Sequence, residues 1–112
     1  MTETGDRRIA RTEALFREVN ERVAERASGF QAGEVEFVCE CGDPACTERI
    51  RTTLEEYEEV REEGDTFLVV KGHEEAPHLE RVVERGGRFN VVRKLHELGE
   101  LVRRLNPRGD TA

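Results

Sequence analysis

Three cysteines, Cys39, Cys41 and Cys46, are the residues of this sequence whose type and spacing point most directly to chemistry. Residues two apart on an extended segment point to the same side, so the Cys39 and Cys41 sulfurs can converge on one ion. Gly42 then allows a sharp turn and Asp43 favours one, so Cys46 can supply a third thiolate from the opposite side. This spacing predicts a metal site that still needs one ligand.

We expect the fourth ligand to be a histidine, because zinc prefers sulfur and nitrogen donors and usually takes four of them. The chain has three, His73, His78 and His96. His73 closely follows the apolar run 67–70, so we expect it to project from a strand end that lies beside the cysteine loop. We therefore predict His73 as the ligand, with His78 as the second choice and His96 as a distant third.

Two other interpretations of the cysteines are weaker. Free cysteine is among the most buried residue types, so burial of all three in the core is one alternative, but the stretches that flank them are polar turn sequence. A disulfide between Cys39 and Cys41 would close a very small, strained ring, and an odd number of cysteines leaves one thiol over. The cluster therefore favours metal binding.

The composition limits the size of the core and the kind of partner. The chain has 112 residues, of which 38% are charged and 5% aromatic, so it fits one small domain that a bound ion would help to stabilise. Its net charge of -7 disfavours binding to nucleic acid through the whole surface. No stretch is apolar over the length of a signal or a membrane span, so we expect a cytoplasmic protein with reduced thiols and no membrane association.

The first element that the pattern predicts is a helix over residues 7–27. The stripe expected to face the core is apolar and consists of Ile9, Phe16, Val19 and Val23. Glu13 and Arg17, four residues apart, are expected to pair on the charged opposite face. Packing against the core is favoured for this helix, and a homodimer formed through a terminal helix is the alternative.

The cysteine loop is expected to lie between two short strands. Residues 34–39 alternate as a half-buried strand, and residues 47–52 can continue as a second one. Thr53 and Glu56 then form a capping box that opens a helix over residues 54–61. The glutamates of this helix and of the residues that follow it indicate a solvated face, or a surface that attracts a basic partner.

The second half of the chain contains one ambiguous segment. Residues 67–70 predict a central buried strand. Residues 79–85 are predicted as a short helix, because Pro77 and Gly86 stand where helix ends are expected. The alternative is a β-hairpin with residues 88–94 across the two glycines 86 and 87.

The C-terminal end is predicted to be a strand over residues 88–93 and an amphipathic helix over residues 95–105. Between residues 88 and 108 there are six basic and two acidic side chains. We expect this basic end to dock on the molecule's own surface, because it lacks the interleaved aromatic residues of a nucleic-acid interface.

Together these elements predict an α+β fold. It has an N-terminal helix, a short three-stranded sheet with intervening helices, a metal-binding cysteine loop and a C-terminal amphipathic helix. The expected organisation is a disordered N-terminus (1–7), a small metal-binding domain (8–94), a helical extension (95–106) and a disordered tail (107–112).

Five separated segments carry a resemblance to a known group of proteins. They are EALFREVNER (13–22), FVCECGD (37–43), CTERI (46–50), LEEYE (54–58) and GHE (72–74). In this order they resemble a group of short bacterial proteins, common in actinobacteria, and the likeness covers about residues 8–94. The resemblance implies a shared small metal-binding module and implies no substrate or activity.

The identity of the metal can be weighed against a second family. CDGSH-type iron-sulfur proteins also use three cysteines and one histidine, beginning with a Cys-x-Cys pair. The likeness ends there, because their third cysteine comes after a longer gap and precedes Asp-Gly-Ser-His, whereas Cys46 precedes Thr-Glu-Arg-Ile. Zinc is therefore favoured, and a [2Fe-2S] cluster is the alternative.

The leading functional hypothesis is a non-enzymatic module, regulatory or protein-binding, with a structural zinc on Cys39, Cys41, Cys46 and His73. Its partner is expected to be a protein of unknown identity. The alternative is an iron-sulfur electron carrier, or a thiol sensor that releases its ion on oxidation. Catalysis is least favoured, because the sequence has no Ser-His-Asp set, phosphate loop or nucleotide fingerprint, and only a reversed near-match to cytidine-type deaminases.

Overall fold

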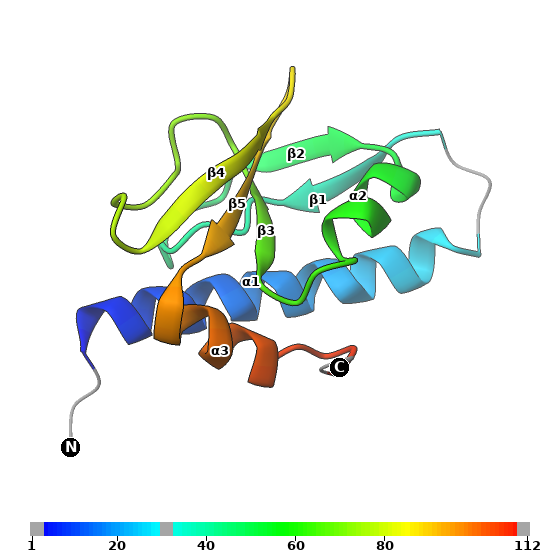
Figure 1. Cartoon of the computed structure of the whole chain (residues 1–112). Coiled ribbons are helices and arrows are strands. Elements are labelled where there is room, and N and C mark those ends of the chain that lie inside the picture. The colour runs from blue at the N-terminus through cyan, green and yellow to red at the C-terminus, as the bar shows by residue number, and fades with distance from the viewer. Residues whose placement is uncertain (1–3, 30–32, 110–112) are drawn as a thin grey trace.

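The computed structural model describes residues 4–29 and 33–109, and within them it has an α+β architecture of helices and two small antiparallel sheets (Figure 1). The helices are α1 (Gly5–Ala27), α2 (Leu54–Val60) and α3 (His96–Arg104). The strands are β1 (Val35–Val38), β2 (Arg49–Thr52), β3 (Thr66–Val69), β4 (Glu80–Arg85) and β5 (Asn90–Lys94). Along the described parts of the chain, no helix combines the length and the apolar character needed to cross a membrane.

Helix α1 extends beneath both sheets and packs against β1, α2 and α3 (Figure 1). It begins where the Thr4 hydroxyl accepts a hydrogen bond from the Arg7 backbone N–H. Its buried side is not the predicted apolar stripe. The buried residues are small or polar: Ala10, Glu13, Ala14, Arg17, Asn20, Glu21 and Ala24. The predicted stripe is half-buried at best, and Val19 is 42% exposed.

The polar residues of α1 are buried because each finds a specific partner. The Arg17 guanidinium donates to the backbone oxygens of Gly64 and Val102 at 2.7 and 2.6 Å and lies over the Phe67 ring. Glu13 lies 2.6 Å from the Lys94 ammonium, which also contacts Glu80 at 3.0 Å. The predicted surface pair of Glu13 and Arg17 is therefore wrong, since both side chains point into the molecule and bind other groups.

The first sheet pairs β1 with β2, and Phe37 lies opposite Ile50. Phe37 stacks on Tyr57 of α2, with ring centroids 4.4 Å apart. Thr53 caps α2 by accepting from the Glu56 N–H at 3.1 Å, so the predicted capping box is confirmed. Both predicted strands that flank the cysteine loop are present.

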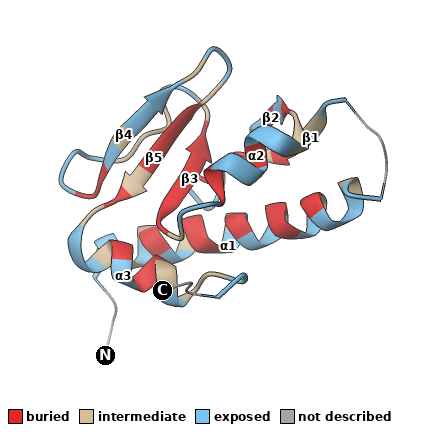
Figure 2. Cartoon of the chain, turned by 45° about the vertical axis from the view of Figure 1, so that its right-hand side comes forward, coloured by how far each residue is buried: buried red, intermediate tan, exposed pale blue. Residues whose placement is uncertain are grey.

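The second sheet has the strand order β3-β5-β4, and β3 and β5 form its buried part (Figure 2). The strand predicted to be central, β3, therefore lies at an edge of this sheet. All four of its residues are nevertheless buried. Its free edge is covered by Glu40 of the cysteine loop, whose N–H donates to the Leu68 oxygen at 2.9 Å and whose carboxylate accepts from the Leu68 N–H at 3.0 Å.

The prediction of a helix over residues 79–85 is wrong, because this segment forms strand β4 and pairs with β5 as the alternative hairpin. Val82 lies opposite Val92, and these β-branched side chains suit a strand. Pro77 stands in a turn closed by the Leu79 N–H, which donates to the Ala76 oxygen at 2.9 Å. Pairing with β5 determines that this segment is a strand, and a local sequence pattern does not contain that pairing.

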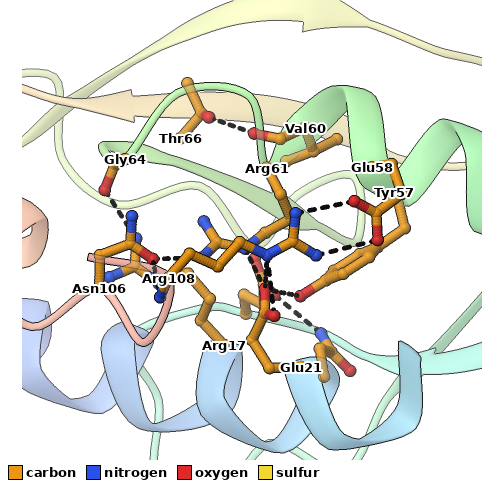
Figure 3. Close-up of polar contacts among 12 residues, drawn as sticks. Arg17, Glu21, Tyr57, Glu58, Val60, Arg61, Gly64, Thr66, Asn106 and Arg108 are labelled. Carbon is orange, nitrogen blue, oxygen red and sulfur yellow. Dashed lines mark hydrogen bonds and ion pairs between the residues drawn. The ribbon is translucent and has the colours of Figure 1, made fainter. Parts of the chain in front are cut away.

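The basic C-terminal end docks on the molecule itself, as predicted. Arg108 forms ion pairs with Glu58 of α2 and Glu21 of α1 (Figure 3). Glu21 also accepts from Tyr57 at 3.1 Å and from Arg61 at 2.5 Å. This network joins both helices to the segment that follows α3.

Candidate metal centre

The ends of three strands bring the predicted ligands together. Cys39 directly follows β1, Cys46 stands three residues before β2, and His73 stands four residues after β3. With Cys41, these residues offer one sulfur or nitrogen atom each, and the four atoms all lie within 4.8 Å of one another. Among the described residues, this is the one group of three or more His, Cys, Asp or Glu side chains that converges in this way.

Two of the distances from His73 match the sulfur–nitrogen edge of a zinc tetrahedron. His73 Nδ1 lies 3.6 Å from the Cys39 sulfur and 3.6 Å from the Cys46 sulfur. Bond lengths of about 2.3 Å to sulfur and about 2.05 Å to nitrogen, at tetrahedral angles, require a sulfur–nitrogen separation of about 3.6 Å. The four residues are thus close enough to hold one metal ion.

The surroundings make two of the thiols, Cys39 and Cys41, poor acids unless a cation is present. Cys39 and Cys41 are buried, whereas Cys46 and His73 are half-buried. Burial raises the pKa of Cys39 above its ordinary range and the pKa of Cys41 to about 11, and the neighbouring thiols raise the pKa of Cys39 further. Since the thiolate is the form that binds metal, a divalent ion would supply the charge that stabilises it here.

Backbone hydrogen bonds hold the ligands in place. The Val70 N–H donates to the Cys39 sulfur at 3.2 Å, and the Val70 oxygen accepts from the His73 N–H at 2.9 Å. The Cys46 N–H donates to the Asp43 oxygen at 3.0 Å, which closes the predicted turn. A side chain at Gly42 would collide with the Ile9 methyl group and the Glu75 carboxylate, so glycine lets the loop pack closely.

Glu40 fixes the cysteine loop to both neighbouring elements, and the sequence analysis missed it. Its N–H donates to the Leu68 oxygen at 2.9 Å, and its carboxylate accepts from the Leu68 N–H at 3.0 Å. The same carboxylate accepts from the Asn20 amide at 2.9 Å, and Asn20 also bonds both backbone groups of Val38. The available signal is alternation: if Cys39 and Cys41 face the ion, Glu40 must point to the opposite side.

The other two histidines lie away from the cysteine cluster. His78 is exposed, and its Nε2 lies 3.6 Å from an Asp6 carboxylate oxygen. His96 is exposed at the start of α3, with a positive φ of 52°. Only His73 joins the three cysteines within 4.8 Å.

Comparisons with models of known protein families, with curated proteins and with solved structures find no significant match to this chain.

Proposed function

We propose that this protein is a non-enzymatic, zinc-stabilised module whose ion is held by Cys39, Cys41, Cys46 and His73. The observation that carries the proposal is the convergence of these four donor atoms within 4.8 Å. Three sulfurs and one nitrogen form a donor set that zinc prefers in structural sites. When bound, zinc would supply positive charge and four directional bonds.

A structural role is favoured because the protein itself provides four ligands. A tetrahedral ion with four protein ligands has no open position at which a water could be activated. The ligands also come from both sheets, since three lie between β1 and β2 and His73 follows β3. The ion would therefore fix the two sheets relative to each other, which suits a regulatory or protein-binding surface.

The spread of the donor atoms favours a single ion over an iron-sulfur cluster. In a [2Fe-2S] cluster the protein ligands are divided between two irons, so ligands of different irons lie farther apart than ligands of one ion. All four donor atoms here fall within 4.8 Å. This closeness supports zinc as the resident metal.

A thiol sensor is the second candidate, and the half-buried position of Cys46 favours it. Hydrogen peroxide could reach this sulfur and accept two electrons from two thiolates. With two protons, the products are one disulfide and two waters, and the ion loses two ligands. Oxidation would thus release the zinc, and the same site would act as a sensor of oxidants.

Metal analysis together with absorption spectroscopy tests the proposal. Protein purified without added metal should contain about one zinc per chain, as one tetrahedral site requires, and should not absorb in the visible. A brown protein containing iron would support the cluster instead. A fully folded protein that neither carries nor takes up zinc would contradict the proposal.

A further inference from the structure

A groove lies between α2 and the second sheet, away from the residues of the metal centre. It consists of two adjoining hollows of ≈ 160 and ≈ 370 Å³ that share the residues Glu56, Glu84, Phe89 and Val91. We call it the acidic groove. The first hollow is smaller than the roughly 300–1,000 Å³ of ordinary small-molecule pockets, and the second is at their lower limit. Such hollows fit side chains of a partner better than a cofactor.

A β-bulge shapes one wall of the acidic groove. Val82 pairs with Val92 and Glu84 pairs with Val91, so Val83 is an extra residue without a partner on β5. A bulge changes the direction in which the side chains of a strand point, and here both Val83 and Glu84 line the first hollow. Val83 is 43% exposed and is one of three exposed large apolar side chains among the described residues; the other two, Leu15 and Val19, lie on α1.

The charge of the groove is negative on both walls. Glu59 and Glu63 line it from the side of α2, and Glu84 lines it from β4. Within residues 4–29 and 33–109, these three carboxylates take part in no ion pair. The two arginines that reach the groove are engaged, since Arg88 pairs with Glu34 and Arg93 contacts Asp65.

We propose that the acidic groove binds an arginine or lysine side chain from a basic segment of a partner protein. The cationic head would lie between the glutamates of α2 and Glu84, and its aliphatic stem would cover Val83 and Phe89. Long cationic side chains bind in this way, with the stem on apolar surface and the charge near carboxylates.

The protein's own basic C-terminal end is not the occupant. Arg108 is bound to Glu21 and Glu58, and Arg103 is bound to Asp65 at 2.5 Å. None of these contacts involves a residue that lines the groove. The inference concerns other residues than the metal ligands, so it can fail while the metal proposal holds.

The test is a titration of the full-length purified protein with the peptide acetyl-Gly-Arg-Leu-Arg-Gly-amide, followed by NMR at physiological ionic strength. We expect the largest shifts at Val83, Phe89 and Val91. Glu84→Gln should weaken binding about 1.4- to fivefold, the range expected for loss of one exposed ion pair. Glu62→Gln is the matched control, because Glu62 is exposed after α2 but does not line the groove, and it should leave the affinity unchanged.

Val83→Ser removes apolar surface from the groove without altering its charge. It therefore tests whether binding depends on the apolar lining of the groove as well as on its acidic residues. It should weaken binding by a similar factor, since the stem of the cation loses apolar contact. Equal weakening by Glu84→Gln and Glu62→Gln, with shifts spread over the whole acidic surface, would overturn the proposal. So would the absence of any binding of the peptide.

Discussion

His73 is the side chain on which the composition of the metal centre depends. Its Nδ1 lies 3.6 Å from two cysteine sulfurs, whereas His78 is exposed near Asp6. We expect His73→Ala to lower zinc affinity by more than the roughly 10–100-fold that loss of an outer hydrogen-bond partner of a ligand costs. His78→Ala, the matched control, should leave it unchanged. Competition with a chromophoric chelator measures both, and the reverse ranking would assign the fourth ligand to His78.

Glu40 supports the cysteine loop through a carboxylate that is completely buried and accepts two hydrogen bonds. Glu40→Ala leaves the Leu68 N–H and the Asn20 amide without this acceptor. Each unsatisfied buried donor costs about 1–3 kcal/mol, so we expect the free energy of unfolding to fall by at least about 2 kcal/mol. Urea denaturation at saturating zinc measures it. Glu36→Ala, on the exposed side of β1, should cost far less, and equal losses would contradict this role.

Among single residues, the sequence predicts the metal ligands more readily than the residues that hold those ligands in place. The spacing of the cysteines is a local pattern, and His73 closely follows the apolar run 67–70. The supporting role of Asn20 depends on α1 passing beside Val38, eighteen positions away along the chain. No local pattern contains that contact.

At the scale of elements, periodicity predicts which segments are regular but not always how they pack. The long helix and the strands around the cysteine loop could be predicted, since their patterns are local. The buried side of α1 could not, because Arg17 and Glu13 are buried only where Gly64 and Lys94 offer partners. The same limit explains β4, whose pairing with β5 outweighs the helix-end signals at Pro77 and Gly86.

The ion-pair network between α1, α2 and the C-terminal segment makes stability sensitive to acid (Figure 3). Burial alone would raise the pKa of Glu21, but hydrogen bonds from Arg61 and Arg108 outweigh burial and lower it below the ordinary 4.5. A carboxyl group with a lowered pKa stabilises the fold above its unfolded pKa. This contribution is lost as the pH falls through the folded pKa.

We therefore expect Glu21→Gln to lower stability at pH 7 and to flatten the loss of stability below about pH 4.5, because the substituted side chain does not titrate. The measurement is the difference in the free energy of unfolding between variant and parent from pH 3 to pH 7 at equal total zinc, since release of zinc at low pH affects both proteins alike. Glu25→Gln on the exposed side of α1 is the control and should keep the acid slope. An unchanged slope in Glu21→Gln would show that other carboxyl groups govern it.

At the scale of the whole molecule, the metal would act as a link between two small sheets. The chain is only 36% hydrophobic, and much of its interior is occupied by charged side chains such as Arg17, Glu13 and Lys94. A domain of this size and composition has a modest hydrophobic core. Binding of an ion to the folded state alone would therefore contribute a large fraction of the total stability.

The expected size of this contribution follows from mass action. At a free zinc concentration of 100 times its dissociation constant, the free energy of unfolding should rise by about 2.7 kcal/mol. Thermal or urea unfolding in zinc-buffered solutions measures the increase. Since the thiols must lose protons to bind, the zinc affinity should also fall as the pH decreases. A variant with Cys46→Ser should lose most of this dependence, and stability independent of zinc in the unsubstituted protein would contradict a structural ion.

X-ray absorption at the zinc edge tests the central claim most directly, because it reports the atoms bound to the ion. A closed site on Cys39, Cys41, Cys46 and His73 predicts three sulfur neighbours at about 2.3 Å and one nitrogen at about 2.0–2.1 Å. A spectrum with fewer than three sulfurs, or with an oxygen ligand from water, would contradict the closed structural centre.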